Sequence, residues 1–309
     1  MTPTSEADGP SNGPAPLTLA LAAYGSWGVL ALFWKQLHHV PASEQLVHRV
    51  IWAAVVFVIL AAWRGDLNAA KAAFVDRARR RRLLLSSTLL AINWFVFVYA
   101  VATDRVLHAS LGYYINPIVS MLLGVFVLRE RLRPLQWCAV GAAALGVALM
   151  VIGAGELPWI GVTVALAFGF YGLTRKTAEV EALPGNTIET ALLALPCLAV
   201  LGWIELGSGD GGHFLSVDWK TTLLLLATGP ATAFPVLWFT GAARRLPLYV
   251  IGFIQYITPT THFLFAVLLF GETFTSGHAV AFGAIWSGVG LFVLDQVREL
   301  RRERRATHN

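Results

Sequence analysis

The feature that most constrains this 309-residue chain is a series of ten apolar blocks separated by short linkers. Each block holds roughly 18–22 residues, enough for a helix to cross about 30 Å of hydrocarbon at a rise of about 1.5 Å per residue. The blocks cover approximately residues 17–34, 44–63, 83–102, 107–128, 134–152, 158–174, 187–206, 219–241, 248–270 and 277–297. Because little chain remains for a soluble domain, the sequence predicts one all-α integral membrane domain with ten transmembrane helices.

Composition supports this class and limits the alternatives. Only 13% of the residues are charged, about half the share of a soluble domain. Residues 1–16 are polar, rich in Pro and Gly and free of Lys and Arg, so we expect a disordered tail and no signal peptide. The two cysteines, Cys138 and Cys197, fall in apolar blocks, which predicts buried small side chains and neither a disulfide nor a metal site.

The basic residues predict an orientation. With both termini in the cytoplasm and alternating crossings, cytoplasmic segments hold 19 of the 23 Lys and Arg, Arg175 among them, and the opposite side holds three. Arg49 lies inside the second block. This asymmetry predicts an N-in, C-in topology. The basic run 76–83 and the basic tail 298–309 are then orientation signals that contact anionic lipid, and no nucleic-acid partner is expected.

Nearly the same tetrapeptide occurs twice. Residues 114–117 read YINP and residues 256–259 read YITP, 142 positions apart, in the fourth and ninth blocks. Five crossings separate these blocks, so the two copies run in opposite directions. We therefore expect two inverted five-helix repeats, 17–152 and 158–297. Inverted repeats let a central site open to one side of a membrane and then to the other, which is typical of secondary transporters.

Longer motifs carry a family resemblance. They are HRVIW (48–52), INWFVFVYAV (92–101), SLGYYINP (110–117), LRERLRPLQW (128–137), ALPG (182–185) and GFIQYITPT (252–260). Over about residues 20–295 the chain resembles the RarD group of the EamA-type drug/metabolite transporter superfamily. The resemblance implies a ten-helix bacterial inner-membrane transporter with two EamA repeats. It also implies an association with chloramphenicol sensitivity, without defining the substrate.

The second block contains charged side chains near its start. Glu44 and His48 are four residues apart and share a helix face, and Arg49 lies about 100° round from His48. Charges within a span usually face the bundle interior, so Arg49 is a candidate substrate anchor. Glu44 or His48 would be its partner or a proton site. The alternatives are that Arg49 snorkels to the interface and that Glu44 only stabilises the first helical turn.

The repeated motifs supply candidate cavity-lining and kink residues. A proline inside a span frees a backbone carbonyl and kinks the helix. The candidates are Tyr114, Asn116, Pro117, Gln255, Tyr256, Thr258 and Pro259. The alternative is a packing kink in which Asn116 satisfies the freed carbonyl.

Other polar residues near the spans are weaker site candidates or are expected to have structural roles. Asn93, Trp94 and His262 are weaker site candidates, because a lone intramembrane polar residue is often a link between helices. Glu130 and Glu272 each end a span, and we expect them to cap the helix that follows. Glu189 and Glu205 flank the seventh block and are expected near an interface.

Two further expectations concern partners and chemistry. Small residues in 141–146 and at Gly283, Gly288 and Gly290 suit close helix packing within the chain, with a homodimer as the alternative. No H-E-x-x-H, G-x-S-x-G or Walker motif occurs, so no cofactor is expected and a gradient must drive transport. The competing hypotheses are a membrane sensor or scaffold and an intramembrane lipid-modifying enzyme.

Overall fold

A computed structural model describes residues 14–103, 105–153, 159–207, 212–214, 218–269, 271 and 276–306. The regular structure in these ranges is helical, as predicted. The helices are α1 Pro16–Gln36, α2 Ala42–Arg64, α3 Leu67–Val75, α4 Arg77–Ala102, α5 Val106–Phe126, α6 Pro134–Gly153, α7 Trp159–Thr177, α8 Ala182–Gly207, α9 Trp219–Ala243, α10 Leu248–Gln255, α11 Ile257–Leu268 and α12 Ser276–Ala306.

Nine segments of the described chain are long and apolar enough to cross a membrane, and one of them runs across α10 and α11. They coincide with nine of the ten predicted blocks. Helix α7 occupies the remaining block and has 19 residues, but it lies outside this set. The protein is therefore a multi-pass, all-α membrane protein.

Local sequence sets several helix ends. Gly65 ends α2 in the left-handed region at φ 74°, where a side chain would be strained. Asp76 begins α4 by accepting a hydrogen bond from the backbone N–H of Arg79 at 2.8 Å. Asp218 does the same for α9 through Thr221 at 2.7 Å. These backbone hydrogen bonds lower the pKa of both carboxyl groups.

The helices depart from the predicted blocks at three places. The linker after α2 folds into the short helix α3, which the sequence analysis did not predict. Helix α12 continues through much of the basic tail, to Ala306. The ninth block is divided at Tyr256 into α10 and α11, although the Tyr256 backbone, at φ −62° and ψ −16°, stays in the right-handed helical region.

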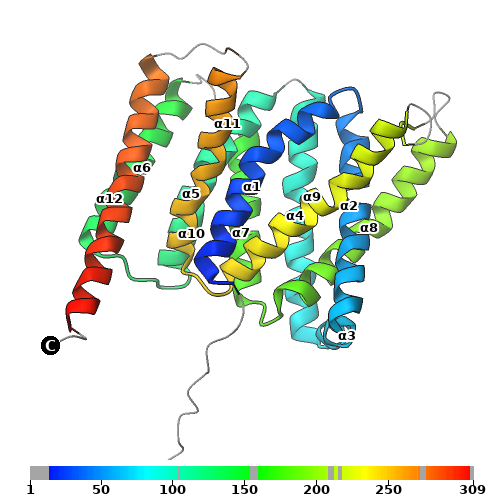
Figure 1. Ribbon diagram of the computed structural model, residues 1–309, viewed down its shortest axis with the longest axis horizontal. Coiled ribbons are helices and arrows are strands. Elements are labelled where there is room, and N and C mark those ends of the chain that lie inside the picture. The colour runs from blue at the N-terminus through cyan, green and yellow to red at the C-terminus, as the bar shows by residue number, and fades with distance from the viewer. Residues whose placement is uncertain are drawn as a thin grey trace, which may run out of the picture.

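Helices of the first half of the chain pack mainly against helices of the second half (Figure 1). Helix α1 contacts α9 and α11, α2 contacts α8 and α9, and α4 contacts α7. Helix α5 contacts α7 and α10, and α6 contacts α12. The two halves are therefore interlocked in one bundle.

The predicted packing of small residues is confirmed at some positions only. A Cβ added at Gly288 of α12 would lie 2.5 Å from the backbone oxygen of Ala139 of α6, so these helices touch along their backbones. Gly283 and Gly290 instead face open space. Cys138 is exposed and Cys197 is half-buried, so the prediction that both are buried was wrong; both thiols are free.

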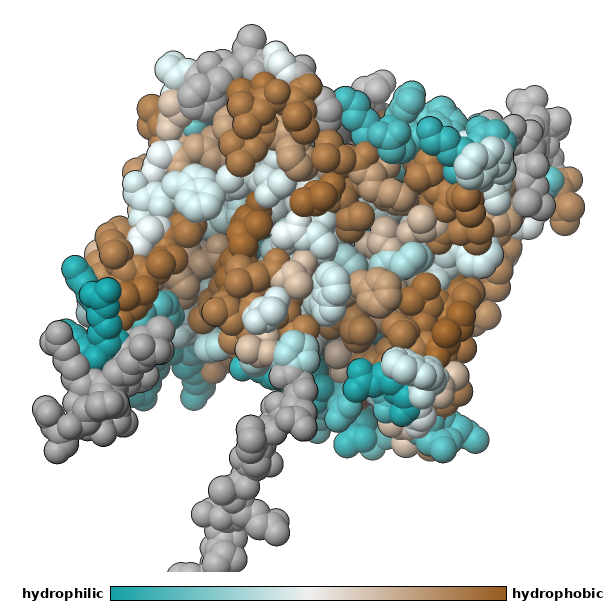
Figure 2. All heavy atoms as spheres, viewed as in Figure 1, coloured by the Kyte–Doolittle hydropathy of each residue, from teal (hydrophilic) through white to brown (hydrophobic). Residues whose placement is uncertain are grey.

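The surface matches a lipid environment. Large apolar side chains such as Trp63, Ile59 and Trp203 are 83%, 61% and 69% exposed. Figure 2 shows hydrophobic residues across the middle of the molecule and hydrophilic residues gathered at its edges. Hydrocarbon solvates such a surface, whereas water would not.

Candidate functional site

Arg49 projects from α2 towards side chains of three other helices, and together they form the Arg49 cluster. Its Nε donates a hydrogen bond to Thr232 Oγ1 of α9 at 3.0 Å. Its guanidinium carbon lies 4.7 Å from the ring centroid of Trp94 of α4 and 5.3 Å from that of Trp34 of α1. Indole faces attract a cation. This arrangement favours an anchor inside the bundle over snorkelling to the interface.

The expected partners of Arg49 point elsewhere. Within the described residues, no carboxylate lies within ion-pair distance of Arg49. Glu44 Oε1 accepts a hydrogen bond from the backbone N–H of His213 at 2.7 Å, and its Oε2 lies 2.8 Å from His213 Nδ1. His48 is fully buried beside Glu44. The prediction that either residue pairs with Arg49 was wrong, because the 100° turn between neighbouring helical positions separates the two faces.

The Arg49 cluster continues towards the first repeated motif. Tyr113 of α5 is an electrostatic neighbour of Arg49. Its ring lies 5.8 Å, centroid to centroid, from that of His262 of α11 and 6.3 Å from that of Phe97. His262 Nε2 in turn lies 3.2 Å from the backbone oxygen of Trp27 of α1. Of the weaker candidates, Trp94 and His262 are thus brought towards Arg49.

The two copies of the repeated motif meet directly. Tyr114 Oη of the first copy donates a hydrogen bond to the backbone oxygen of Pro259 in the second at 3.1 Å. A Cβ added at Gly252 would lie 2.7 Å from the backbone oxygen of Pro117, so α5 and α10 cross closely there. Thr258 Oγ1 donates to the backbone oxygen of Tyr24 at 2.7 Å. The two motifs therefore form one of the contacts between the halves.

Buried polar atoms around this contact are left unpaired. Asn116 Oδ1, both amide atoms of Gln255, Tyr256 Oη and Tyr24 Oη have no hydrogen-bond partner of normal geometry within the described chain, although Tyr24 and Gln255 are close enough to interact with each other. Buried polar groups are normally paired. A concentration of unpaired ones favours a place that receives water or a polar ligand. It does not favour the alternative in which Asn116 Oδ1 serves only the packing of a kink.

Asn93 has a structural role. Its Nδ2 donates a hydrogen bond to the backbone oxygen of Val164 at 2.9 Å. This bond joins α4 to α7, the link between helices that the sequence analysis offered as the alternative.

Glu130 caps a helix, but not the one expected. Its Oε1 accepts from the backbone N–H of Leu248 at 2.9 Å and its Oε2 from that of Tyr249 at 3.2 Å. These groups open α10, whereas the prediction named the following helix, α6. The close packing of α5 and α10 brings the end of one helix beside the start of the other. Glu272 lies outside the described residues.

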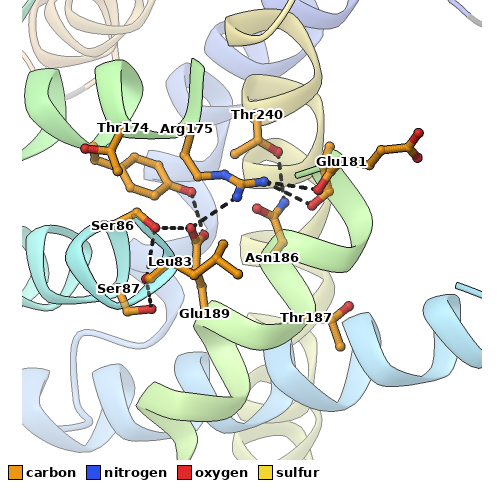
Figure 3. A network of polar contacts seen from close by, with 12 residues as sticks. Leu83, Ser86, Ser87, Thr174, Arg175, Glu181, Asn186, Thr187, Glu189 and Thr240 are labelled. Atoms are coloured by element: carbon orange, nitrogen blue, oxygen red, sulfur yellow. Dashed lines mark hydrogen bonds and ion pairs between the residues drawn. The ribbon is translucent and has the colours of Figure 1, made fainter. Parts of the chain in front are cut away.

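A second buried polar network joins α4, α7 and α8 (Figure 3). Arg175 Nη1 lies 3.4 Å from Glu189 Oε1, and both side chains are almost completely buried. Ser86 Oγ donates to Glu189 Oε1, and Tyr171 Oη donates to Oε2 at 3.3 Å. Glu189 was expected near an interface; the structure places its carboxylate inside the bundle, in an ion pair with Arg175.

Relatives of this chain have been described in several bacteria. Residues 15–152 match the EamA-like transporter family. Protein RarD of Escherichia coli is 40% identical over 284 residues, covering 92% of this chain and 95% of that one. An uncharacterized transporter of Pseudomonas aeruginosa is 44% identical, covering 92% and 95%. This chain belongs to the RarD group of the EamA-like transporter family.

The family also has relatives at greater distance. A chloramphenicol-sensitive protein RarD of Pseudomonas aeruginosa is 30% identical over 93% of this chain and 96% of that one. A crystal structure with 20% sequence identity superposes at a TM-score of 0.68, covering 90% of this chain and 97% of that chain, which indicates a shared fold. The family model and the named relatives identify this RarD-group protein as a membrane transporter of the drug/metabolite type.

Sequence reasoning missed several residues of this RarD-group site. Trp34, Tyr113 and Thr232 surround Arg49, yet each is an ordinary residue of an apolar helix in the sequence. Arg175 was counted among the cytoplasmic orientation charges, although it is buried in an ion pair. The one sequence feature connected with the burial of Arg175 is the glycine of the ALPG motif. A Cβ at Gly185 would lie 2.2 Å from Arg175 Nη1, so the guanidinium packs where a larger side chain would not fit.

Proposed function

We propose that this RarD-group protein is a secondary-active exporter of small metabolites or drugs in the bacterial inner membrane. Its cargo carries an anionic or strongly hydrogen-bonding group. The observation that carries the proposal is Arg49, a cation inside the bundle that rests on Trp34 and Trp94 and has no described carboxylate partner. An anionic group of the cargo would provide the missing charge, and the indole faces would cover a planar part of it.

The pattern of helix contacts supports two related halves. In the two proposed repeats, α1, α2, α4, α5 and α6 correspond to α7, α8, α9, the α10–α11 pair and α12. Exchanging these counterparts turns the α1–α9 contact into the α7–α4 contact. The same exchange turns α1–α11 into α7–α5, and it maps α2–α8, α5–α10 and α6–α12 onto themselves. All of these contacts are present. This is the pattern expected of the proposed five-helix repeats.

A difference between the two motif copies supports alternating access. The YINP copy lies within the continuous helix α5, whereas the YITP copy spans the break at Tyr256 between α10 and α11. Nearly identical sequences thus adopt two slightly different helical conformations in one chain, and Tyr256 itself keeps right-handed helical dihedral angles. In an inverted-repeat transporter, exchanging these conformations between the halves would move the opening from one side of the membrane to the other.

Ligand-induced thermal stabilisation of the purified full-length protein tests the cargo class. The panel would contain carboxylate- and phosphate-bearing metabolites, amino acids and chloramphenicol. A ligand at 100 times its Kd stabilises the native state by about 2.7 kcal/mol. We expect an anionic compound to raise the unfolding temperature, Arg49→Ala to abolish the rise, and Arg49→Lys to retain part of it. Efflux from proteoliposomes would then be measured with the same compound.

The matched control is Arg64→Ala, because Arg64 ends the same helix with its side chain 65% exposed. This variant should bind as the wild type does. Equal stabilisation of wild type and Arg49→Ala by anionic compounds would contradict the role of Arg49. Binding without any movement across proteoliposomes would contradict transport.

A further inference from the structure

Another polar cluster lies at the start of α2, on a helix face about 100° round from the Arg49 cluster. Glu44 and His48 are 3% and 0% exposed. Glu205, in the last turns of α8, completes the cluster. One oxygen or nitrogen atom from each of Glu44, His48 and Glu205 lies within 4.8 Å of those from the other two. This spacing admits either a cation or a shared proton.

The hydrogen bond of Trp52 decides between these occupants. Trp52 Nε1 donates to His48 Nδ1 at 3.1 Å. Because an indole N–H only donates, Nδ1 accepts, and the single proton of the neutral imidazole is on Nε2. His48 Nε2 lies 3.9 Å from Glu44 Oε1 and is buried without a hydrogen-bond partner in the described chain. A protonated Nε2 cannot ligate a metal, so the geometry favours a proton.

The remaining hydrogen bonds show where the proton sits. A second proton on His48 would require Nδ1 and would break the bond from Trp52. Both oxygens of Glu44 already face His213, through its backbone N–H and its ring. Glu205 Oε1 is buried and has no hydrogen-bond partner in the described chain. Oε1 of Glu205 is thus the one carboxylate oxygen of the cluster that is buried without a described donor.

Charge leads to the same residue. With His48 neutral, two ionised carboxylates would place two negative charges close together, on the buried Glu44 and the half-buried Glu205, which is unfavourable for both. A proton on Glu205 removes one of these charges. We propose that Glu44, His48 and Glu205 form a proton-binding site in which the Glu205 carboxyl group holds the exchangeable proton.

The neighbouring titratable groups do not replace this proton. These groups lie on α2, on neighbouring helices and in the adjoining segments. They are His38, His39, Arg49, Arg64, Asp66, Lys71, Asp76, Arg77, Arg79, Arg80, Arg81, Arg82, Arg175, Lys176, Glu179, Glu181, Glu189, Cys197, His213, Asp218, Lys220, Arg244 and Arg245. Of these, His213 alone forms a described ion pair with the cluster, and it does so with Glu44. Arg49 bonds to Thr232 on the other side of α2.

This site would couple transport to a proton gradient, an inference that rests on the proposed function. His48 immediately precedes Arg49 on α2, so a shift of α2 moves the proton cluster and the cargo anchor together. Proton uptake at Glu205 would thereby be linked to the accessibility of Arg49. The driving ion of the proposed exporter would be the proton.

Infrared difference spectroscopy of the full-length protein in lipid nanodiscs tests the assignment without any cargo. Spectra recorded between about pH 5 and about pH 9 cover the range in which perturbed carboxyl groups and histidines titrate. We expect the C=O band of a protonated carboxyl group, shifted in D₂O, to disappear on deprotonation. Glu205→Gln should remove that band, and Glu205→Asp should shift it.

The matched control is Glu179→Gln, because the Glu179 side chain is 74% exposed and the residue should not contribute to the band. A band unchanged in both Glu205 variants would overturn the assignment. Binding of one Zn²⁺ per chain by calorimetry, abolished by Glu205→Gln and unaccompanied by a carboxyl band, would overturn it in favour of a metal. A cargo panel without hits would count against the proposed function and leave this readout intact.

Discussion

Replacing Glu189 with glutamine should destabilise the protein more than removing the whole Arg175–Glu189 pair. The substitution keeps the size of the side chain but leaves the Arg175 guanidinium charged and without a counter-ion. Arg175 is 0% exposed and Glu189 is 1% exposed, so water cannot replace the lost carboxylate. Hydrogen bonds from Arg175 Nη2 to the backbone oxygens of Glu181 and Ala182, at 3.3 and 3.4 Å, hold the guanidinium in place.

The expected loss of unfolding free energy follows from the burial of this ion pair. Removing one partner of a buried ion pair costs about 3–5 kcal/mol, whereas replacing both partners by apolar residues is often neutral. Glutamine retains one acceptor oxygen, so the bond from Ser86 or the bond from Tyr171 survives and the loss should be nearer about 3 kcal/mol. The double variant Arg175→Met, Glu189→Leu should therefore be more stable than Glu189→Gln.

Equilibrium unfolding in mixed detergent micelles, followed by circular dichroism, measures these free energies. Arg175→Met completes a double-mutant cycle, which isolates the coupling between the two charges. Glu179→Gln is the exposed control and should cost less than about 1 kcal/mol. The reasoning fails if Glu189→Gln costs no more than this control, or if the double variant loses the sum of the two single losses.

Three further predictions concern backbone contacts. Gly185→Ala should destabilise by about 1–3 kcal/mol in the same unfolding assay, since its Cβ would meet the buried guanidinium, whereas Gly202→Ala on the same helix meets open space and should not. Glu130→Gln should speed hydrogen exchange of the first amides of α10 by roughly 5-fold, corresponding to about 1 kcal/mol of capping, and unchanged exchange would contradict the cap. The backbone N–H of Thr221 lowers the pKa of Asp218, so its contribution is present above the ordinary aspartate value of about 3.9 and is lost as the pH falls through the lower folded value. Asp218→Asn should remove that part of the acid dependence of the unfolding free energy.

Hydrophobic block length predicted most of the fold, because a helix is the one way an isolated segment can satisfy its backbone in hydrocarbon. Nine of the ten blocks are described helices or helix pairs of sufficient length. The same reasoning could not predict α3, since a 9-residue helix at the surface has no constraint of span length. It also counted Arg175 as an orientation charge, because a cation at the end of an apolar block has the same sequence pattern whether it is solvated or paired.

The sequence singled out Arg49 as a candidate, but not the residues that surround it. Arg49 stood out because a charge inside an apolar block is rare. Trp34, Tyr113 and Thr232 come from three different helices, and only the tertiary fold brings their side chains towards Arg49. Helical periodicity placed Glu44 and His48 on one face correctly. The partner on that face, His213, lies 169 residues from Glu44 and could not be inferred from spacing.

The break at Tyr256 shows why the repeated motif alone could not predict the conformation of either copy. Both copies contain a proline, and both could form a kinked or a broken helix. Nevertheless α5 is continuous through Pro117, while the second copy divides into α10 and α11 before Pro259. The Tyr114 hydroxyl then bonds the backbone oxygen of Pro259, so the continuous copy supports the broken one. If Tyr114→Phe removes this support, the break should become more mobile and hydrogen exchange at Thr260 and Thr261 should quicken by roughly 2–10-fold, corresponding to about 0.5–1.5 kcal/mol for one hydrogen bond. Tyr99→Phe, at an exposed tyrosine of α4, is the control. Exchange that is equal in the wild type and in Tyr114→Phe would show that the break is maintained by α10 and α11 themselves and not by contact with the other copy.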